Sequence, residues 1–155
     1  MTHRRVDAAR HAGARARLPA RREALLHAVI ATLWLSGVAW LVFHHFVRVA
    51  GEFGELPHPL EAWWLRLHGA AVFVLLWLLG VLWPTHLLPA WRSRRRASGI
   101  VLATLLAVLT LSGWLLYYGS EQARDAVSLL HWTVGLAFAL PMLWHALRGR
   151  GSGRA

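Results

Sequence analysis

The side chains of this chain best suited to chemistry are its 10 histidines, several of which lie within apolar stretches. His131 and His145 occupy the two ends of the run HWTVGLAFALPMLWH. On a straight helix this spacing brings both side chains within about 40° of one face and about 21 Å apart along the axis. Ionisable residues inside a membrane span are costly and tend to mark functional sites. The pair therefore indicates axial ligation of two stacked haems, one near each end of the helix.

Two other histidine pairs have a related spacing. His27 and His45, and likewise His68 and His86, are eighteen residues apart, which is five helical turns, so each pair shares one face. The spacing predicts two layers of imidazoles at opposite ends of a helical bundle. The outer layer contains His44, His45, His68 and His131, and the inner layer contains His27, His86 and His145.

Haem iron in an electron-transfer cytochrome takes two strong axial ligands, and neutral imidazoles from two helices supply both. We expect His68, His131 and His145 to be ligands. Their spacing along the helices, their positions in the two layers and the helix faces they occupy all fit haem ligation. A histidine near the end of a span is more commonly an interfacial polar residue or a partner in a helix-to-helix hydrogen bond. We expect such a role for His44, His45 and His58.

Composition places the chain in a membrane. It is 57% hydrophobic, and its mean hydropathy is +0.43. Cysteine is absent, which excludes disulfides, iron-sulfur clusters, thiolate zinc sites and covalent haem attachment. Any haem must therefore be a non-covalent, b-type haem held by histidine.

Four apolar segments are near the length needed to cross a bilayer about 30 Å thick. They predict an all-α fold, an integral membrane four-helix bundle over residues 25–147. A disordered, Arg-rich cytoplasmic tail is expected over 1–24 and a basic C-terminal tail over 148–155. The first loop is expected to be a structured turn region from Gly51 to Glu61. The predicted spans are Leu25 to Val47, Trp64 to Leu88, Gly99 to Tyr118 and Ala126 to Leu147.

The positive charges are distributed unevenly along the chain. Arginines crowd the N-terminal tail, the loop between the second and third spans, and the segment after the last span. The positive-inside rule places these three segments, and both termini, in the cytoplasm, as expected for the inner membrane of a bacterium. The net charge of +10 is explained by topology and anionic headgroups. We therefore expect the bilayer, and not nucleic acid, as the partner of these charges.

The last span resembles the final haem-binding helix of bacterial di-haem cytochromes b, such as the gamma subunit of formate dehydrogenase and the cytochrome b subunit of nickel-iron hydrogenase. The motif is Ser128-Leu129-Leu130-His131, then Gly135, then His145 and a basic tail. The resemblance implies that His131 ligates the outer haem and His145 the inner one. It also implies that Gly135 makes room for the porphyrin.

The second and third spans extend the resemblance. Leu67-His68-Gly69 resembles the family's second span, whose histidine completes the outer haem. Ser112-Gly113 matches a Ser/Thr-Gly pattern in a helix that supplies no ligand. The first span has a similar pair, Ser36-Gly37; such pairs usually permit close helix packing, and a haem face passing near the backbone needs the same small residues.

Two residues compete to be the fourth ligand. The pattern of the gamma subunit implies His27, at the inner end of the first span. In related cytochromes the second and fourth helices supply all the ligands. That pattern implies His86 as the fourth ligand here. His86 follows Pro84 by two residues, and a proline kink can reposition it. The sequence leaves both open.

The expected function is that of a membrane cytochrome b with two haems, which passes electrons between a quinone and a redox partner protein that docks at the outer face. We expect an electron-transfer subunit of an oxidoreductase rather than an enzyme acting alone. The alternative is a haemless structural or assembly membrane protein in which the histidines pack the bundle.

Overall fold

The computed structural model describes residues 19–88 and 97–151. It contains four helical rods, each long and apolar enough to cross a membrane, which confirms the four predicted apolar helices. The composition and length of these helices are those of a multi-pass membrane protein. The rods are α2 (Ala20–Phe46), α3 (Pro59–Leu82) continued by the π-helix η1 (Trp83–Leu87), α5 (Ala97–Tyr118), and α6 (Glu121–Ala137) continued by α7 (Ala139–Gly151).

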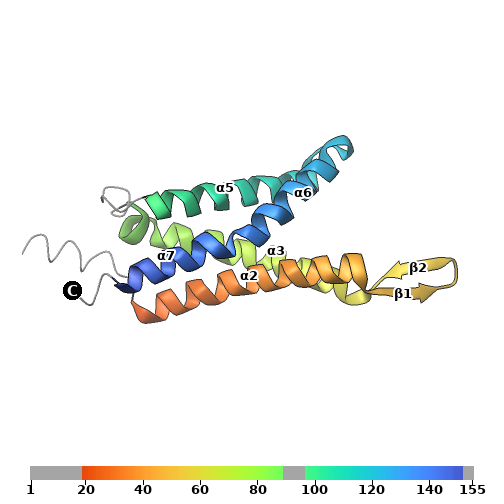
Figure 1. Cartoon of the computed structure of the whole chain (residues 1–155), viewed down its shortest axis with the longest axis horizontal. Coiled ribbons are helices and arrows are strands. Elements are labelled where there is room, and N and C mark those ends of the chain that lie inside the picture. Colours follow the sequence, from red (N-terminus) through yellow and green to blue (C-terminus); the bar gives the residue numbers. More distant parts are fainter. Residues whose placement is uncertain (1–18, 89–96, 152–155) are drawn as a thin grey trace, which may run out of the picture.

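The rods form two helical hairpins that lie side by side (Figure 1). In the first, α2 packs along α3; in the second, α5 packs against α6 and α7, and closer packing occurs within the hairpins than between them. The turn between α5 and α6 lies at the same end of the bundle as strands β1 (Arg48–Gly51) and β2 (Gly54–Pro57), and we call this the hairpin end. The start of α2 and the end of α7 lie at the opposite end, which we call the terminal end.

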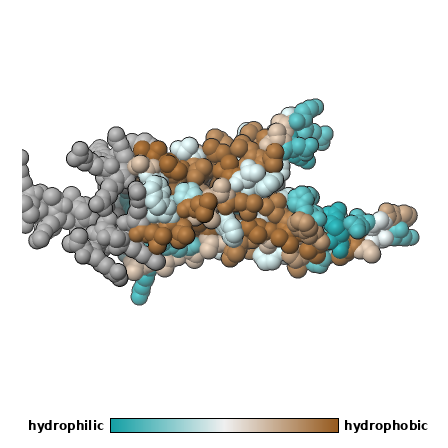
Figure 2. All heavy atoms as spheres, in the orientation of Figure 1, coloured by the Kyte–Doolittle hydropathy of each residue, from teal (hydrophilic) through white to brown (hydrophobic). Residues whose placement is uncertain are grey.

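The surface of the bundle is apolar. Figure 2 shows a broad hydrophobic band between the helices' ends, with hydrophilic residues gathered at the hairpin end. Few side chains are buried within the described ranges, and α3 contributes a stripe of them: Ala71, Leu75, Leu78 and Leu82. That spacing follows one face of a helix, so α3 packs its stripe inward. A surface this apolar is compatible with a lipid bilayer.

The first loop differs from the predicted turn between Gly51 and Glu61. β1 and β2 form an antiparallel hairpin in which Gly51 pairs with Gly54. Gly54 has a φ of 126°, which favours glycine because it lacks a Cβ. The expected turn is therefore a two-stranded ribbon that starts before Gly51.

Helix α3 begins at Pro59, earlier than the expected Trp64. Proline suits the first turn of a helix, because its missing N–H would be unpaired there. His58 caps the helix: the Leu60 N–H donates to His58 Nδ1 at 3.1 Å. These two signals place the start of α3 directly after the ribbon.

The expected tails also differ in their bounds. α2 begins at Ala20, so the last residues of the predicted tail 1–24 are helical, and residues 1–18 lie outside the described residues. The N–H groups of Arg22 and Glu23 donate to the carbonyl of Pro19, which starts the helix. The predicted C-terminal tail 148–155 begins within α7, and residues 152–155 lie outside the description.

The last span is not one straight helix, as the spacing of His131 and His145 assumed. α6 ends at Ala137 and α7 starts at Ala139. Pro141 explains the break. Its ring would clash with the carbonyl of Ala137, four residues earlier, and it has no N–H to donate to that carbonyl. Backbone hydrogen bonds continue through Phe138, so the break is a kink and not a loop. His131 therefore lies on α6 and His145 on α7.

Candidate functional site

His68 projects from α3 toward α2, where two oxygens hold one of its ring nitrogens. Its Nδ1 lies 3.2 Å from Ser36 Oγ and 3.0 Å from the carbonyl oxygen of Leu33. A carbonyl can only accept a hydrogen bond, so Nδ1 carries the proton. The other nitrogen, Nε2, then has the lone pair that a metal requires.

His131 repeats this arrangement in the second hairpin. Its Nδ1 lies 2.8 Å from the Oγ of Ser112 on α5. The Ser112 hydroxyl donates to the carbonyl of Leu109 at 3.2 Å, just as the Ser36 hydroxyl donates to that of Leu33 at 3.0 Å. With its proton used in this way, Ser112 Oγ accepts from Nδ1, and Nε2 again has the lone pair.

The glycine that follows each serine makes room for the histidine ring that the serine contacts. A Cβ added to Gly37 would lie 3.3 Å from His68 Cε1, and one added to Gly113 would lie 3.4 Å from His131 Cε1. Each Ser-Gly pair thus serves one imidazole: the serine fixes its nitrogen, and the glycine lets the ring approach the backbone. The sequence drew attention to both pairs but not to this role. Gly135 lies near α5, where an added Cβ would be 3.8 Å from Leu109 Cδ2.

The two rings lie edge-on to each other where the two hairpins meet. The ring centres of His68 and His131 are 6.3 Å apart, and the ring planes are inclined at 77°. An imidazole nitrogen binds a metal at about 2.0 to 2.1 Å and lies about 1.1 Å from the centre of its own ring. When two imidazoles bind one metal from opposite sides, their ring centres are therefore about 6.2 to 6.4 Å apart. Two such rings are free to rotate about their common axis. The observed separation therefore suits one metal ion between them.

His145 takes part in a second contact between α5 and the last span. Its Nδ1 lies 3.0 Å from Ser98 Oγ. Ser98 and Ser112 are separated by as many residues as His131 and His145, so the two pairs form matching cross-links between antiparallel helices. Both hydrogen bonds are present although the last span is kinked at Phe138, between the two histidines.

The terminal end also gathers the two candidates for a fourth ligand. His86 lies on η1 and His27 on α2, and each is close enough to His145 to interact with it electrostatically. All three rings are partly buried. Pro84 lies in η1, a widened turn of a kind that frequently occurs at functional sites.

The three other histidines of the described residues lie at the hairpin end. His44 Nδ1 lies 2.7 Å from Glu61 Oε1, and its ring stacks on Trp40. His58 caps α3. His45 is exposed beside His44.

The number of side chains available as ligands distinguishes a haem site from a site for a bare metal ion. Within residues 19–88 and 97–151, no group of three or more His, Cys, Asp or Glu side chains is placed to hold a metal ion. A haem iron needs only two ligands from the protein, because the porphyrin supplies the other four. Two neighbouring imidazoles, each with its Nδ1 held by an oxygen, fit that need.

Comparison with known proteins provides no relative for the chain. No protein-family model, no curated protein and no solved structure matches it. The case for a function therefore rests on the geometry of the side chains themselves.

Proposed function

We propose that the chain is a membrane b-type cytochrome whose first haem is held between His68 and His131. The observation that supports this most is the pair of imidazoles, which lie on separate helical hairpins with ring centres 6.3 Å apart. Each ring has its Nδ1 fixed by a serine, which leaves Nε2 for the iron. The four apolar helices are compatible with the fold that the resemblance to di-haem cytochromes b implies.

The residues around the pair would tune the ligands. A hydrogen bond from Nδ1–H to an oxygen fixes the tautomer and the orientation of a ligating histidine and makes it a stronger donor. Ser36 and Leu33 do this for His68, and Ser112 does it for His131. When bound, the haem supplies one-electron redox chemistry. Two imidazole ligands leave no open position on the iron, so the site suits electron transfer and not oxygen chemistry.

We propose a second haem at the terminal end, held by His145 together with His27 or His86. Ser98 would fix the Nδ1 of His145 as the other serines do for their histidines. Two haems at opposite ends of the bundle would carry electrons across the membrane, between a quinone and a redox partner protein. By the positive-inside rule the hairpin end faces outward from the inner membrane of a bacterium, and the partner docks there.

Haem content tests the proposal. The chain is purified from membranes of cells supplied with a haem precursor, and its haem is measured as the pyridine haemochrome, with a reduced-minus-oxidised spectrum alongside. We expect two non-covalent b haems per chain. One haem per chain would remove one layer of ligands from the proposal. A folded, colourless protein that stays colourless with added haem would instead support the haemless structural protein.

A further inference from the structure

Arg66 lies on a face of α3 that is exposed and otherwise apolar. Five residues at intervals of three and four share this face: Trp63, Arg66, Ala70, Phe73 and Trp77. Trp63, Phe73 and Trp77 are 62%, 75% and 66% exposed. Because α3 is long and apolar enough to cross a membrane, lipid would cover this face along most of its length.

The interior of the bundle lies on the opposite side of α3. His68 follows Arg66 by two residues, about 200° around the helix, and the buried Leu75 follows it by nine residues, about 180°. The Arg66 side chain therefore leaves the helix on the side opposite the His68 ring. A group bound at that ring is no partner for its charge.

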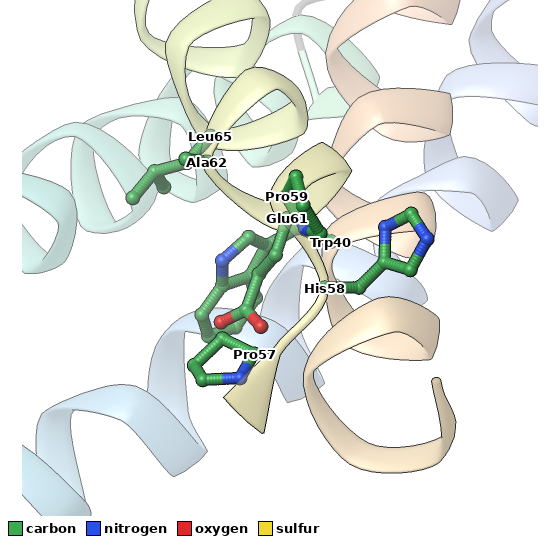
Figure 3. A pocket seen from close by; sticks show the side chains of 7 residues that line it. All are labelled: Trp40, Pro57, His58, Pro59, Glu61, Ala62 and Leu65. Carbon is green, nitrogen blue, oxygen red and sulfur yellow. The ribbon is translucent and has the colours of Figure 1, made fainter. Parts of the chain in front are cut away.

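Arg66 also has no anionic partner in the part of the chain that the structure describes, where its guanidinium forms neither an ion pair nor a hydrogen bond. The only carboxylate of α3 is that of Glu61, which points into a pocket that it lines with Trp40 and Pro57 (Figure 3). One of its oxygens, Oε1, is held by His44 Nδ1 at 2.7 Å. The five N–H groups of the Arg66 guanidinium are thus available to a ligand.

The guanidinium of Arg66 extends toward the hairpin end. Its central carbon, Cζ, lies 5.0 Å from the ring centre of Trp63, which is one turn closer to that end. Helical side chains tilt toward the N-terminus of their helix, and α3 starts at the hairpin end (Figure 1). Long basic side chains near the ends of spans reach the membrane interface in this way, and tryptophan is enriched there too. The cation–π contact restricts the guanidinium without using its N–H groups.

We propose that Arg66 and Trp63 bind the phosphate of an anionic phospholipid in the leaflet at the hairpin end. The N–H groups of a guanidinium form a planar fork that matches two phosphate oxygens, and such charge-assisted hydrogen bonds are strong. The acyl chains then run along the apolar face, past Phe73 and Trp77. The site does not depend on the proposed haems, because it lies on the other side of α3.

The net charge of the headgroup favours an anionic lipid over a zwitterionic one. A zwitterionic headgroup contains a cation of its own, which competes with Arg66 for the phosphate. An anionic headgroup has no such cation, so its net charge is neutralised by the guanidinium. Attraction of one arginine to an anionic lipid surface corresponds to a preference of about fivefold.

A fluorophore next to Arg66 can measure this preference locally in the full-length chain. Ala70→Cys, labelled with bimane, places the fluorophore one turn from Arg66 on the same exposed face, and the chain has no other cysteine. The labelled chain is reconstituted in phosphatidylcholine bilayers that contain increasing fractions of phosphatidylglycerol with brominated acyl chains. Bromine quenches bimane on contact, so the quenching curve gives the relative affinity of this position for the anionic lipid.

Three further substitutions are made in the labelled chain. Arg66→Gln removes the charge and the fork, so we expect the fivefold preference to fall to about equal binding of the two lipids. Trp63→Leu removes only the ring and should cause a smaller fall. Arg124→Gln removes the same charge from an exposed arginine at the hairpin end, next to Asp125, and should leave the preference unchanged. Circular dichroism checks that the helix content of all four proteins is equal.

Loss of the preference in Arg66→Gln, with the preference kept in Arg124→Gln, supports the site. An unchanged preference in Arg66→Gln overturns it. An equal fall in Arg124→Gln overturns it too, because net charge alone would then explain the result. Inorganic phosphate, added at constant ionic strength, should not reduce the quenching; if it does, the ligand is free phosphate and the lipid site is wrong.

Discussion

The rings of His68 and His131 belong to different helical hairpins and lie edge-on to each other with centres 6.3 Å apart. Neither contact that fixes a ring crosses to the other hairpin: His68 is held by α2, and His131 is held by α5. Each hairpin therefore presents one prepared imidazole, and the pair forms only where the hairpins meet. A ligand between the rings would join the two halves of the bundle.

Ser36 and Ser112 each hold an Nδ1, but His68 also has the Leu33 carbonyl at 3.0 Å, so removal of Ser112 should have the larger effect. Ser36→Ala and Ser112→Ala each delete the oxygen next to an Nδ1. Loss of a partner of this kind typically weakens metal affinity by about 10- to 100-fold. Haem loss to apomyoglobin, followed optically, should be faster for one haem of the two in each variant. Thr133→Ala, which removes a hydroxyl bonded only to its own helix, is the matched control and should not change it.

The glycine next to each serine provides a steric test. Gly37→Val places methyl groups where the ring of His68 lies, since even a Cβ would come within 3.3 Å of it. We expect the haem at the hairpin end to be lost while the other haem remains. Gly80→Val is a matched control on α3, because a Cβ there would meet nothing within 4 Å. Equal haem content in both variants would contradict the role given to Gly37.

The terminal end allows the fourth ligand to be identified. His145→Ala should remove the second haem and leave the first. Only one of His27→Ala and His86→Ala should reproduce its spectrum, because one iron with two imidazoles has a single remaining position. Low-temperature difference spectra of the three variants provide the comparison. If neither variant altered the second haem, both candidates would be excluded.

Topology can be tested with single cysteines, because the chain contains none. Phe53→Cys lies at the tip of the ribbon, where the native side chain is 97% exposed. Ala20→Cys lies at the start of α2, at the terminal end. A membrane-impermeant maleimide should label the first in intact cells and the second only after the membrane is opened. The reverse pattern would invert the proposed orientation.

The helices were predictable from the sequence because their signals are local. Apolar length alone identified four spans, and helical spacing sorted the histidines into two layers. The break at Phe138 was missed because the fourteen-residue argument assumed a straight helix, although Pro141 lies within it. The ribbon was missed because its glycines and prolines were interpreted as a turn, and strand pairing between Arg48 and Pro57 is not a periodic feature.

The contacts of the site were harder to predict, because they depend on how one helix is rotated against another. Ser36 and His68, or Glu61 and His44, meet only after α2 and α3 have packed. The spacing of residues along a single helix does not determine how that helix is rotated against its neighbour. The sequence therefore directed attention to these histidines but could not predict which atoms they contact.

The most direct test of the central claim compares His68→Ala, His131→Ala and the double variant. If both residues bind one iron, each single substitution removes the same haem, and the double variant loses no more than either one. His45→Ala, an exposed histidine at the same end, controls for loss of an imidazole. Haem per chain should fall from two to one in all three variants and stay at two in the control. Two haems in each single variant, or a further loss in the double variant, would contradict the account.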